Sequence, residues 1–338
     1  MPKIRNSLFE WSNKMLTSSN LTPLSTIERL REEASSRKYF RLSNQESSFV
    51  GVFSPPEKEL NRQFVFLSLF LKKEGVTVPE VFYFDEGLGF MLIEDFGDKA
   101  YQFSINRSNF HHLFSSAIDE MVNINKCPQD KNLSLLSRKD LRDQMLLFEE
   151  WFLRSLLQIS PTSEEIEMIN SMYDEILDNL EKQPKALCHF DFETRNLMLL
   201  ESGSTGVLDF QDATFGPIFL DPASLLKDLH FELKDSEINQ FLDSFLSKSI
   251  ESGLIKEIDF LKARECFDFA SLQRQLRILG TLSRLHLRDK KSFRLPDLIK
   301  TLEFFIETTS KYKRFQAISS HLGNKILPIL KLKIKEIL

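Results

Sequence analysis

The sequence is poor in cysteine and has no long hydrophobic run. Its three cysteines, Cys127, Cys188 and Cys266, lie far apart, and this odd, unpaired set fits neither a disulfide framework nor a zinc site. The strongly apolar stretch at 64–71 is too short to cross a bilayer and is interrupted by Ser68. The N-terminal segment shows no apolar h-region and no small-residue cleavage site, so no secretory signal is expected. We therefore expect a cytoplasmic protein with reduced thiols.

An excess of positive charge is also absent. The 338 residues include 44 Lys and Arg against 49 Asp and Glu, which gives a net charge of −5. Such a chain has no general attraction for nucleic acid or for an anionic membrane surface. We expect neither a nucleic-acid partner nor stable membrane association, and the sequence indicates no oligomeric state. Phenylalanine is abundant, with 31 copies, so Phe and Leu should build the cores.

Short strand-like segments with intervening turn residues dominate the first part of the chain. In chain order we expect a helix at 5–18, strands at 24–31, 38–42 and 48–53, a helix at 57–73, and strands at 81–84 and 90–94. Pro56 followed by Glu57 is typical of a helix entry. These segments predict an antiparallel five-stranded sheet with one packed helix.

From residue 97 onward helical periodicity takes over. Helices are expected at 108–125, 138–158, 163–182 and over most of 222–315, with one β-rich segment at 186–210. No repeat or low-complexity linker separates the two parts, so a short hinge near 94–98 should join them. We predict an α+β protein with an N-terminal lobe at 1–96 and a mainly helical C-terminal lobe at 97–338.

The β-rich segment holds most of the residues suited to catalysis. It contains His189-Phe190-Asp191, then Asn196, and thirteen residues later Asp209. Phosphoryl transfer to a hydroxyl needs a carboxylate beside the attacking oxygen and oxygen ligands that hold magnesium on the phosphates. Asp191 and Asn196 share one loop, and a hairpin made of 197–200 and 206–208 would return Asp209 to the metal. The pattern predicts Asp191 as catalytic base, with ATP and Mg²⁺ held through Asn196 and Asp209.

The arrangement H-x-D-x-x-x-x-N followed by D-F-x resembles the aminoglycoside phosphotransferase and choline kinase branch of the kinase-like superfamily. The resemblance implies a bilobal protein-kinase-like fold. It also implies structural roles for His189 and Asp221, with the Asp221 carboxylate bonded to the backbone of the catalytic loop. An alternative is that Asp221 caps a helix at 222–230, since it precedes a proline.

A closer resemblance, which covers nearly the whole chain, is carried by five further segments. They are Ala34-Ser35-Ser36-Arg37-Lys38-Tyr39-Phe40-Arg41, Ser54-Pro55-Pro56-Glu57-Lys58-Glu59, Phe148-Glu149-Glu150-Trp151-Phe152-Leu153, Gly206-Val207-Leu208-Asp209-Phe210-Gln211-Asp212-Ala213 and Gln273-Arg274-Gln275-Leu276-Arg277-Ile278-Leu279-Gly280. In these segments the chain resembles bacterial anomeric kinases of N-acetylmuramate and N-acetylglucosamine in cell-wall recycling. The resemblance implies ATP-dependent phosphorylation of the C1 hydroxyl of either amino sugar.

The ATP contacts are less clearly marked. The turn at 32–38 has no glycine, and the strand at 48–53 lacks the lysine that ordinary kinases place against the phosphates. Hydroxyl, backbone and cationic groups nearby are candidate substitutes, and the hinge should meet adenine. The candidate ATP residues are Ser35, Ser36, Arg37, Arg41, Glu94 and Phe96. A solvated surface position is the alternative for each cation, and a polar turn is the alternative for Glu94.

Acceptor contacts are expected beside the catalytic residues and on a helix near 270–288. Arg277 belongs to a polar stripe with Gln273, Arg284 and Arg288, and a guanidinium can grip the lactyl carboxylate of N-acetylmuramate. The alternative is a solvated basic face. By motif position the other candidates are Glu193, Arg195, Gln211 and Asp212.

Two rival functions stay open at this stage. One is a kinase for another small hydroxyl compound, such as choline, homoserine or an aminoglycoside, although a basic stripe suits a polycationic acceptor poorly. The other is a non-catalytic nucleotide-binding pseudokinase, supported by the missing strand lysine. The tail at 325–338 could lie on a membrane surface, or pack its apolar side onto the helical lobe, and Pro328 should prevent one continuous helix there.

Overall fold

The computed structural model describes residues 2–30 and 36–338. The chain divides into two compact units, the first made of Met1–Asn123 with Arg195–Asp212 and the second of Ile124–Thr194 with Ala213–Leu338. This grouping by compactness is a different division from the expected lobes at 1–96 and 97–338, which stay a prediction. The chain leaves the second unit after Thr194, completes the first, and returns at Ala213.

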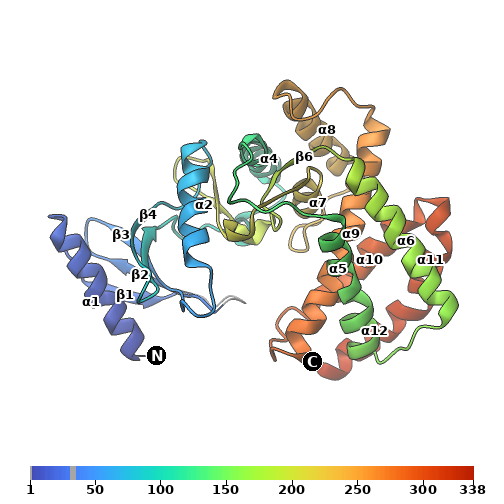
Figure 1. The fold of residues 1–338 in the computed structure, drawn as a ribbon, viewed down its shortest axis with the longest axis horizontal. Helices are drawn as coiled ribbons and strands as arrows, with labels where there is room; N and C mark the ends of the chain where they lie inside the picture. Colours follow the sequence, from blue (N-terminus) through green and yellow to red (C-terminus); the bar gives the residue numbers. More distant parts are fainter. Residues whose placement is uncertain (1, 31–35) are drawn as a thin grey trace. The chain divides into compact units, whose positions relative to one another are not determined.

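The first unit is built on an antiparallel five-stranded sheet in the order β1-β2-β3-β5-β4 (Figure 1). Its elements are α1 (Pro2–Ser18), β1 (Thr26–Arg29), β2 (Lys38–Ser43), β3 (Ser48–Phe53), α2 (Asn61–Lys73), β4 (Val81–Asp85), β5 (Phe90–Glu94), α3 (Tyr101–Ser104), α4 (Phe110–Lys126), the turn η2 (Thr194–Asn196), β7 (Leu197–Leu199), β8 (Thr205–Val207) and the turn η3 (Phe210–Asp212). The predicted five-stranded sheet is confirmed, with a first strand shorter than the expected 24–31.

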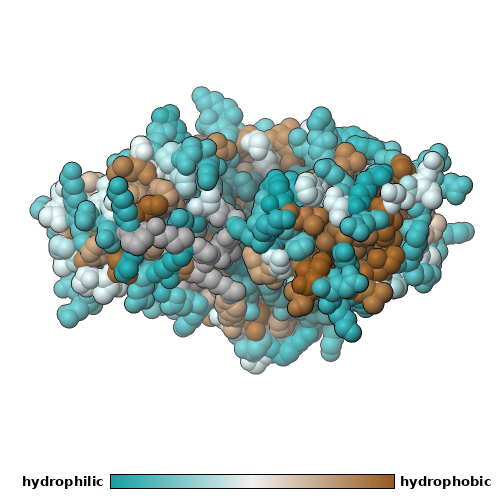
Figure 2. Space-filling view, turned by 90° about the horizontal axis from the view of Figure 1, so that it is seen from below, coloured by the Kyte–Doolittle hydropathy of each residue, from teal (hydrophilic) through white to brown (hydrophobic). Residues whose placement is uncertain are grey.

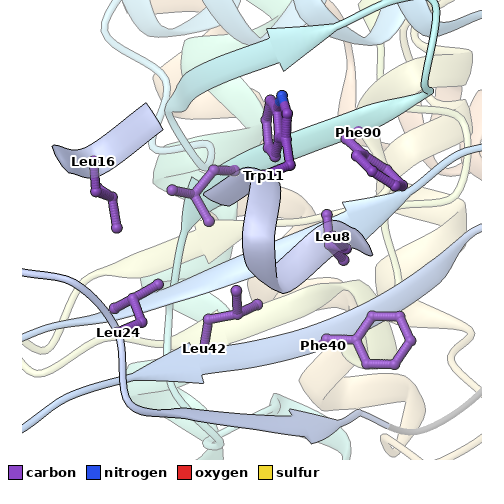
Figure 3. Packing of buried hydrophobic residues seen from close by; sticks show 8 residues of the cluster. Leu8, Trp11, Leu16, Leu24, Phe40, Leu42 and Phe90 are labelled. Carbon is purple, nitrogen blue, oxygen red and sulfur yellow. The ribbon is translucent and has the colours of Figure 1, made fainter. Parts of the chain in front are cut away.

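Helix α1 covers one face of this sheet because its apolar residues recur at helical spacing. Leu8, Trp11 and Leu16 point toward strand residues that include Phe40 and Phe90, as Figure 3 shows. The Trp11 and Phe90 rings lie 5.7 Å apart between centroids. Burying each such side chain contributes about 1.5–3 kcal/mol. Figure 1 shows α2 on the opposite face of the sheet, so the strands are covered on both sides.

Helix α2 begins at Asn61, so the predicted entry at Pro56 and Glu57 is wrong. The Pro55 carbonyl accepts hydrogen bonds from the backbone of Lys58 and Glu59 at 3.0 and 3.1 Å, which makes a separate turn. The buried Asn61 side chain donates to the Ser54 carbonyl at 2.9 Å and fixes the helix start after that turn. The turn presents Glu59 to the beginning of β2 instead of to the helix surface.

The second unit is mainly helical, as predicted. Its elements are α5 (Arg138–Leu147), the π-helix η1 (Phe148–Leu156), α6 (Ser163–Lys182), β6 (Lys185–Cys188), β9 (Thr214–Pro217), α7 (Leu220–Leu226), α8 (Asp235–Glu251), α9 (Phe260–Leu287), α10 (Asp297–Ser310), the turn η4 (Lys313–Phe315), α11 (Gln316–His321), the π-helical η5 (Leu322–Ile326) and α12 (Leu327–Ile337). Strands β6 and β9 pair as a two-stranded antiparallel sheet at the base of the catalytic loop.

Helix α9 is the central helix of the second unit, and most of its middle is buried. A side chain at Gly280 would collide with the backbone of Leu147, so glycine permits α9 to lie directly against the end of α5. The predicted helix at 138–158 changes at this contact from α-helical to π-helical geometry, which begins at Phe148. Wider turns of this kind are frequent at functional sites.

The tail packs on the helical unit through Leu330 and Ile334, which are both buried. The expectation that Pro328 would prevent one continuous helix over 325–338 agrees with the elements, since the π-helical η5 ends at Ile326 and α12 begins at Leu327. Pro328 stands in the first turn of α12, directly after the wider turn η5, and a proline there needs no hydrogen-bond donor of its own. On the face seen in Figure 2, hydrophobic side chains gather over the helices of the second unit. Among the described residues, no helix is long and apolar enough to cross a membrane.

Candidate active site

The predicted catalytic loop, which carries Asp191, follows β6 and is held by a buried carboxylate. Asp221 accepts hydrogen bonds from the backbone N–H groups of His189, at 2.6 Å, and Phe190, at 2.8 Å. Burial raises the pKa of Asp221, and the neighbouring His189 and these two N–H donors oppose the shift. Phe190 has a φ of +78°, which is unusual for a residue with a side chain. Asp221 thus holds a strained loop, and it lies inside α7 instead of capping it.

Asp191 and Arg277 meet in the second unit. The Arg277 Nη2 atom donates to Asp191 Oδ1 at 2.6 Å and to the Phe190 carbonyl at 3.1 Å. Its guanidinium lies over the Phe190 ring, 4.0 Å from the centroid. The Asp191 side chain is 34% exposed and that of Arg277 14%. The sequence predicted Asp191 as catalytic base and Arg277 as an acceptor contact, but it did not indicate that the two side chains would be paired.

Glu193 is engaged by arginines that sequence reasoning missed. Arg274 Nη2 donates to Glu193 Oε2 at 2.9 Å, and its Nε donates to the Ser224 hydroxyl at 2.8 Å. Arg294 lies 3.9 Å from the other Glu193 oxygen. The Glu193 side chain is 3% exposed, so its carboxylate supports the loop from inside, and sugar contact stays a prediction. Arg274 stands within a segment that carried the family resemblance, which was the available signal.

A second buried carboxylate holds the end of the catalytic loop. Asp228 Oδ2 accepts from the Thr194 backbone N–H at 2.8 Å and from the Thr194 hydroxyl at 3.0 Å. Burial raises the pKa of Asp228, and the nearby Glu193 carboxylate adds to the shift. Asp221 and Asp228 therefore fix the two ends of one loop. Nothing in the local sequence marked Asp228.

The β7–β8 hairpin carries the two expected magnesium ligands in the first unit. The Leu208 N–H donates to the Asn196 carbonyl at 2.8 Å, which closes the hairpin between Asn196 and Asp209. Asp209 has a φ of +62°, and Gln211 Nε2 donates to its Oδ1 at 2.6 Å. The Phe210 ring packs 5.0 Å from that of Phe64 of α2, which anchors the motif to the unit.

This donor set fits magnesium. Among the described residues, no group of three or more His, Cys, Asp or Glu side chains could hold a metal. Magnesium in nucleotide sites needs only one or two protein oxygens, since phosphates and water complete its coordination. One carboxylate at Asp209 and one amide at Asn196 match that requirement. Cys127, Cys188 and Cys266 are buried free thiols.

Arg37 is a buried cation of the first unit that shares a neighbour, Phe64, with the Asp209 motif. It lies 3.2 Å from Glu59 Oε2, and its guanidinium is 5.3 Å from the centroid of the Phe64 ring that also packs on Phe210. Burial raises the pKa of Tyr39 to about 12, with Arg37 opposing and Asp209 adding to the shift, so both charges act on one phenol. The structure brings Arg37 and the Asp209 motif into one neighbourhood, which the sequence could not show.

Two other residues expected to contact ATP, Ser36 and Arg41, form bonds with carboxylates of the first unit. Ser35 lies outside the described residues, and Ser36 bonds Glu59 through its backbone N–H at 3.2 Å and through its hydroxyl. Arg41 pairs with Asp95 at 2.7 Å and with Asp98 at 2.6 Å. Burial opposes ionisation of Asp95, but hydrogen bonds from Arg41, Ser48 and Gly97 hold its pKa below the usual value. Arg41 thus ties β2 to the segment that follows β5.

The residues expected at the hinge lie on or beside strands of the first unit, and the remaining acceptor candidates lie in turns and on α9. Phe96 lies against β8, where a side chain at Gly206 would come within 2.6 Å of its ring. Glu94, at the end of β5, accepts from the Glu80 backbone N–H at 3.2 Å. Arg195, Gln211 and Asp212 stand in the turns that flank the hairpin, with Asp212 exposed. In α9, Gln273 is wholly buried and donates to Gln144 at 2.8 Å, so the stripe is not a solvated face along its whole length.

Comparison with known proteins indicates the family of the chain. The model of the phosphotransferase enzyme family matches residues 26–254. An N-acetylmuramate/N-acetylglucosamine kinase of Pseudomonas putida is 30% identical over 289 residues, which cover 86% of this chain and 85% of the relative. A protein of the same name from Neisseria meningitidis serogroup B is also 30% identical, over 83% of this chain and 84% of its own length.

Solved structures show the same fold at lower identity. The ADP-bound aminoglycoside phosphotransferase APH(2'')-Ib superposes with a TM-score of 0.61 at 17% identity, covering 89% of this chain and 98% of its own. The choline kinase LicA from Streptococcus pneumoniae gives a TM-score of 0.62 at 14% identity, covering 88% and 98%. The predicted kinase-like fold is confirmed.

Proposed function

Since the chain belongs to the phosphotransferase enzyme family, we propose that it is an ATP-dependent kinase that phosphorylates the anomeric (C1) hydroxyl of N-acetylmuramate and N-acetylglucosamine. The curated relatives named above carry both sugars in their name and match most of the chain. The product would be a sugar 1-phosphate. Because ATP is an intracellular substrate, we expect the reaction in the cytoplasm.

The observation that carries the proposal is the clamped loop that presents Asp191. Asp221 and Asp228 bond four donors of this loop, at His189, Phe190 and Thr194, so the Asp191 carboxylate is held in one place while staying partly exposed. A carboxylate so placed can accept the proton of an attacking hydroxyl or orient its oxygen. The anomeric hydroxyl of a sugar is more acidic than an ordinary alcohol, so a carboxylate suffices as its base.

Asn196 and Asp209 would hold magnesium at the ends of the β7–β8 hairpin. The ion, when bound, neutralises phosphate charge. Gln211 orients the Asp209 carboxylate by its hydrogen bond at 2.6 Å, and the Leu208–Asn196 bond keeps the two ligands at one end of the hairpin. Arg37, buried beside Phe64 and within electrostatic range of Tyr39, is the cation that we assign to the phosphates in place of the missing strand lysine.

Acceptor recognition is assigned to Arg277 beside Asp191 and, by motif position, to the turns that flank the hairpin. Arg277 supplies a guanidinium at the catalytic carboxylate itself, which suits an acceptor that carries negative charge and disfavours a polycationic one. Arg195, Gln211 and Asp212 flank the same loop and hairpin and are further candidates for the sugar hydroxyls. This charge pattern favours an acidic or neutral amino sugar over choline or an aminoglycoside.

A panel assay tests the proposal. ADP release by the purified protein with ATP and magnesium should occur with N-acetylmuramate and N-acetylglucosamine. It should stay at the background rate with choline, homoserine and kanamycin. The site of transfer is checked by phosphorus and carbon NMR of the product, which should show phosphate on C1. Turnover on another compound would support kinase activity but contradict the proposed sugar acceptors. ATP binding without any turnover would favour a pseudokinase.

A paired substitution tests Arg37. Arg37→Gln should raise the KM for ATP by about tenfold to a hundredfold, because a charge-assisted contact contributes about 1.5–3 kcal/mol. Glu59→Gln removes only the partner and keeps the cation, so its effect on the KM for ATP should be much smaller. If both variants change the KM equally, Arg37 acts only through its pair with Glu59. Arg62→Gln, which breaks an exposed pair between α2 and Glu86 of the β4–β5 turn, is the control and should leave the KM unchanged.

A further inference from the structure

Arg277 contacts Oδ1 of Asp191, an oxygen that the proposed kinase would use to accept the hydrogen bond of the sugar hydroxyl. Arg277 Nη2 lies 2.6 Å from Asp191 Oδ1, and Arg274 Nη2 lies 3.9 Å from the same oxygen. An oxygen that already accepts a charge-assisted hydrogen bond at this distance is a poorer acceptor for an incoming hydroxyl. In this structure the Asp191 carboxylate is therefore partly engaged by arginine.

Arg277 has contacts with Phe190 that it can keep if its hydrogen bond to Asp191 is replaced. Its guanidinium rests on the Phe190 ring, 4.0 Å from the centroid, and also donates to the Phe190 carbonyl at 3.1 Å. A guanidinium has five N–H donors, so it can keep these contacts while other donors turn to a new carboxylate. Arg274, in contrast, is fixed by Glu193 and Ser224. Arg277 is therefore the one of these two arginines that we expect to exchange its contact with Asp191.

We propose that the negative charge of an acidic amino sugar competes with Asp191 for Arg277, so that binding of the acceptor frees the catalytic carboxylate. The inference rests on the proposed function. N-acetylmuramate carries a carboxylate on its lactyl group and N-acetylglucosamine carries none, so only the first sugar can draw Arg277 away. Arg277 is then a residue that determines specificity and also positions Asp191.

The test is a double-mutant cycle on binding, which does not require turnover. Dissociation constants of both sugars are measured by titration calorimetry with magnesium and a non-hydrolysable ATP analogue. The readout is the ratio of the N-acetylglucosamine constant to the N-acetylmuramate constant. Asp191→Asn removes the competitor for Arg277, so this ratio should rise by about tenfold or more, as expected for one charge-assisted contact. Arg277→Gln should lower the ratio. In the double variant Arg277→Gln with Asp191→Asn, the ratio should stay as low as in Arg277→Gln alone.

The cycle separates the inference from simple charge repulsion and from the proposed function. If Asp191→Asn raises the ratio equally with and without Arg277, plain repulsion between two carboxylates explains it and the inference is overturned. An unchanged ratio in Asp191→Asn overturns it as well, even if Arg277→Gln proves unstable. Wild-type protein that binds neither sugar would overturn the proposed function together with the inference. Arg154→Gln removes the same charge from an exposed pair with Glu149 in the second unit and should keep the wild-type ratio.

Discussion

Asp191→Asn is expected to lower kcat by about 10²–10⁴-fold, the range that a positioned general base contributes. The amide can still accept a hydrogen bond, but it cannot take the proton of the sugar hydroxyl. Because ATP is held by other residues, the KM for ATP should change little. Steady-state ADP release with N-acetylmuramate gives both constants, and circular dichroism checks that the loop substitution leaves the fold intact.

The control for this variant is Asp289→Asn. Asp289 is a carboxylate paired with an arginine on the same unit, since Arg288 Nε lies 2.7 Å from it, but it is outside the catalytic loop. It should keep wild-type kcat. Retention of more than a tenth of the activity by Asp191→Asn would mean that another group accepts the proton, or that transfer needs no base.

Arg274→Met is expected to destabilise the protein by about 3–5 kcal/mol, the cost of leaving one partner of a buried ion pair without compensation. The methionine fills much of the space of the arginine stem, so the loss reports the charge more than a cavity. Glu193, only 3% exposed, would then stand near Asp228 without its close cation. The free energy of unfolding, measured by urea denaturation at neutral pH, gives the cost.

Two further variants make that measurement specific. Glu193→Gln in the Arg274→Met background should recover part of the loss, because it removes the uncompensated charge. Arg154→Met breaks an exposed pair with Glu149, whose side chains are 42% and 21% exposed, and should cost about 0–1 kcal/mol. An Arg274→Met variant as stable as Arg154→Met would show that Glu193 is relieved by protonation or by Arg294.

The sequence was sufficient for the sheet and for most helices because their patterns are local. The strands expected at 38–42, 48–53 and 90–94 match β2, β3 and β5 almost residue for residue. The errors arose where distant contacts decide. Helix α2 starts late because Asn61 bonds Ser54, and the π-helix begins at Phe148, next to the Leu147 backbone on which α9 packs at Gly280.

The candidate site shows the same limit. Asp191, Asn196, Asp209 and Asp221 stand in a motif whose spacing can be read directly. The partners of these residues stand in no such motif, because the choice of partner depends on which helix packs against the loop. Arg274 and Arg277 are one turn apart on α9, and both are arginines in one segment. Only packing determines that the first is buried on Glu193 and the second lies at Asp191.

The insertion of Arg195–Asp212 into the first unit has a consequence for biosynthesis. The sheet of the first unit leaves the ribosome early, but the hairpin that completes the unit follows more than seventy residues of the second. Until then, the Thr77 carbonyl and the Tyr101 hydroxyl lack the Val207 N–H and the Thr205 hydroxyl to which they bond at 2.8 and 2.6 Å. A nascent chain therefore cannot complete its first unit before it has made residues 124–194 of the second.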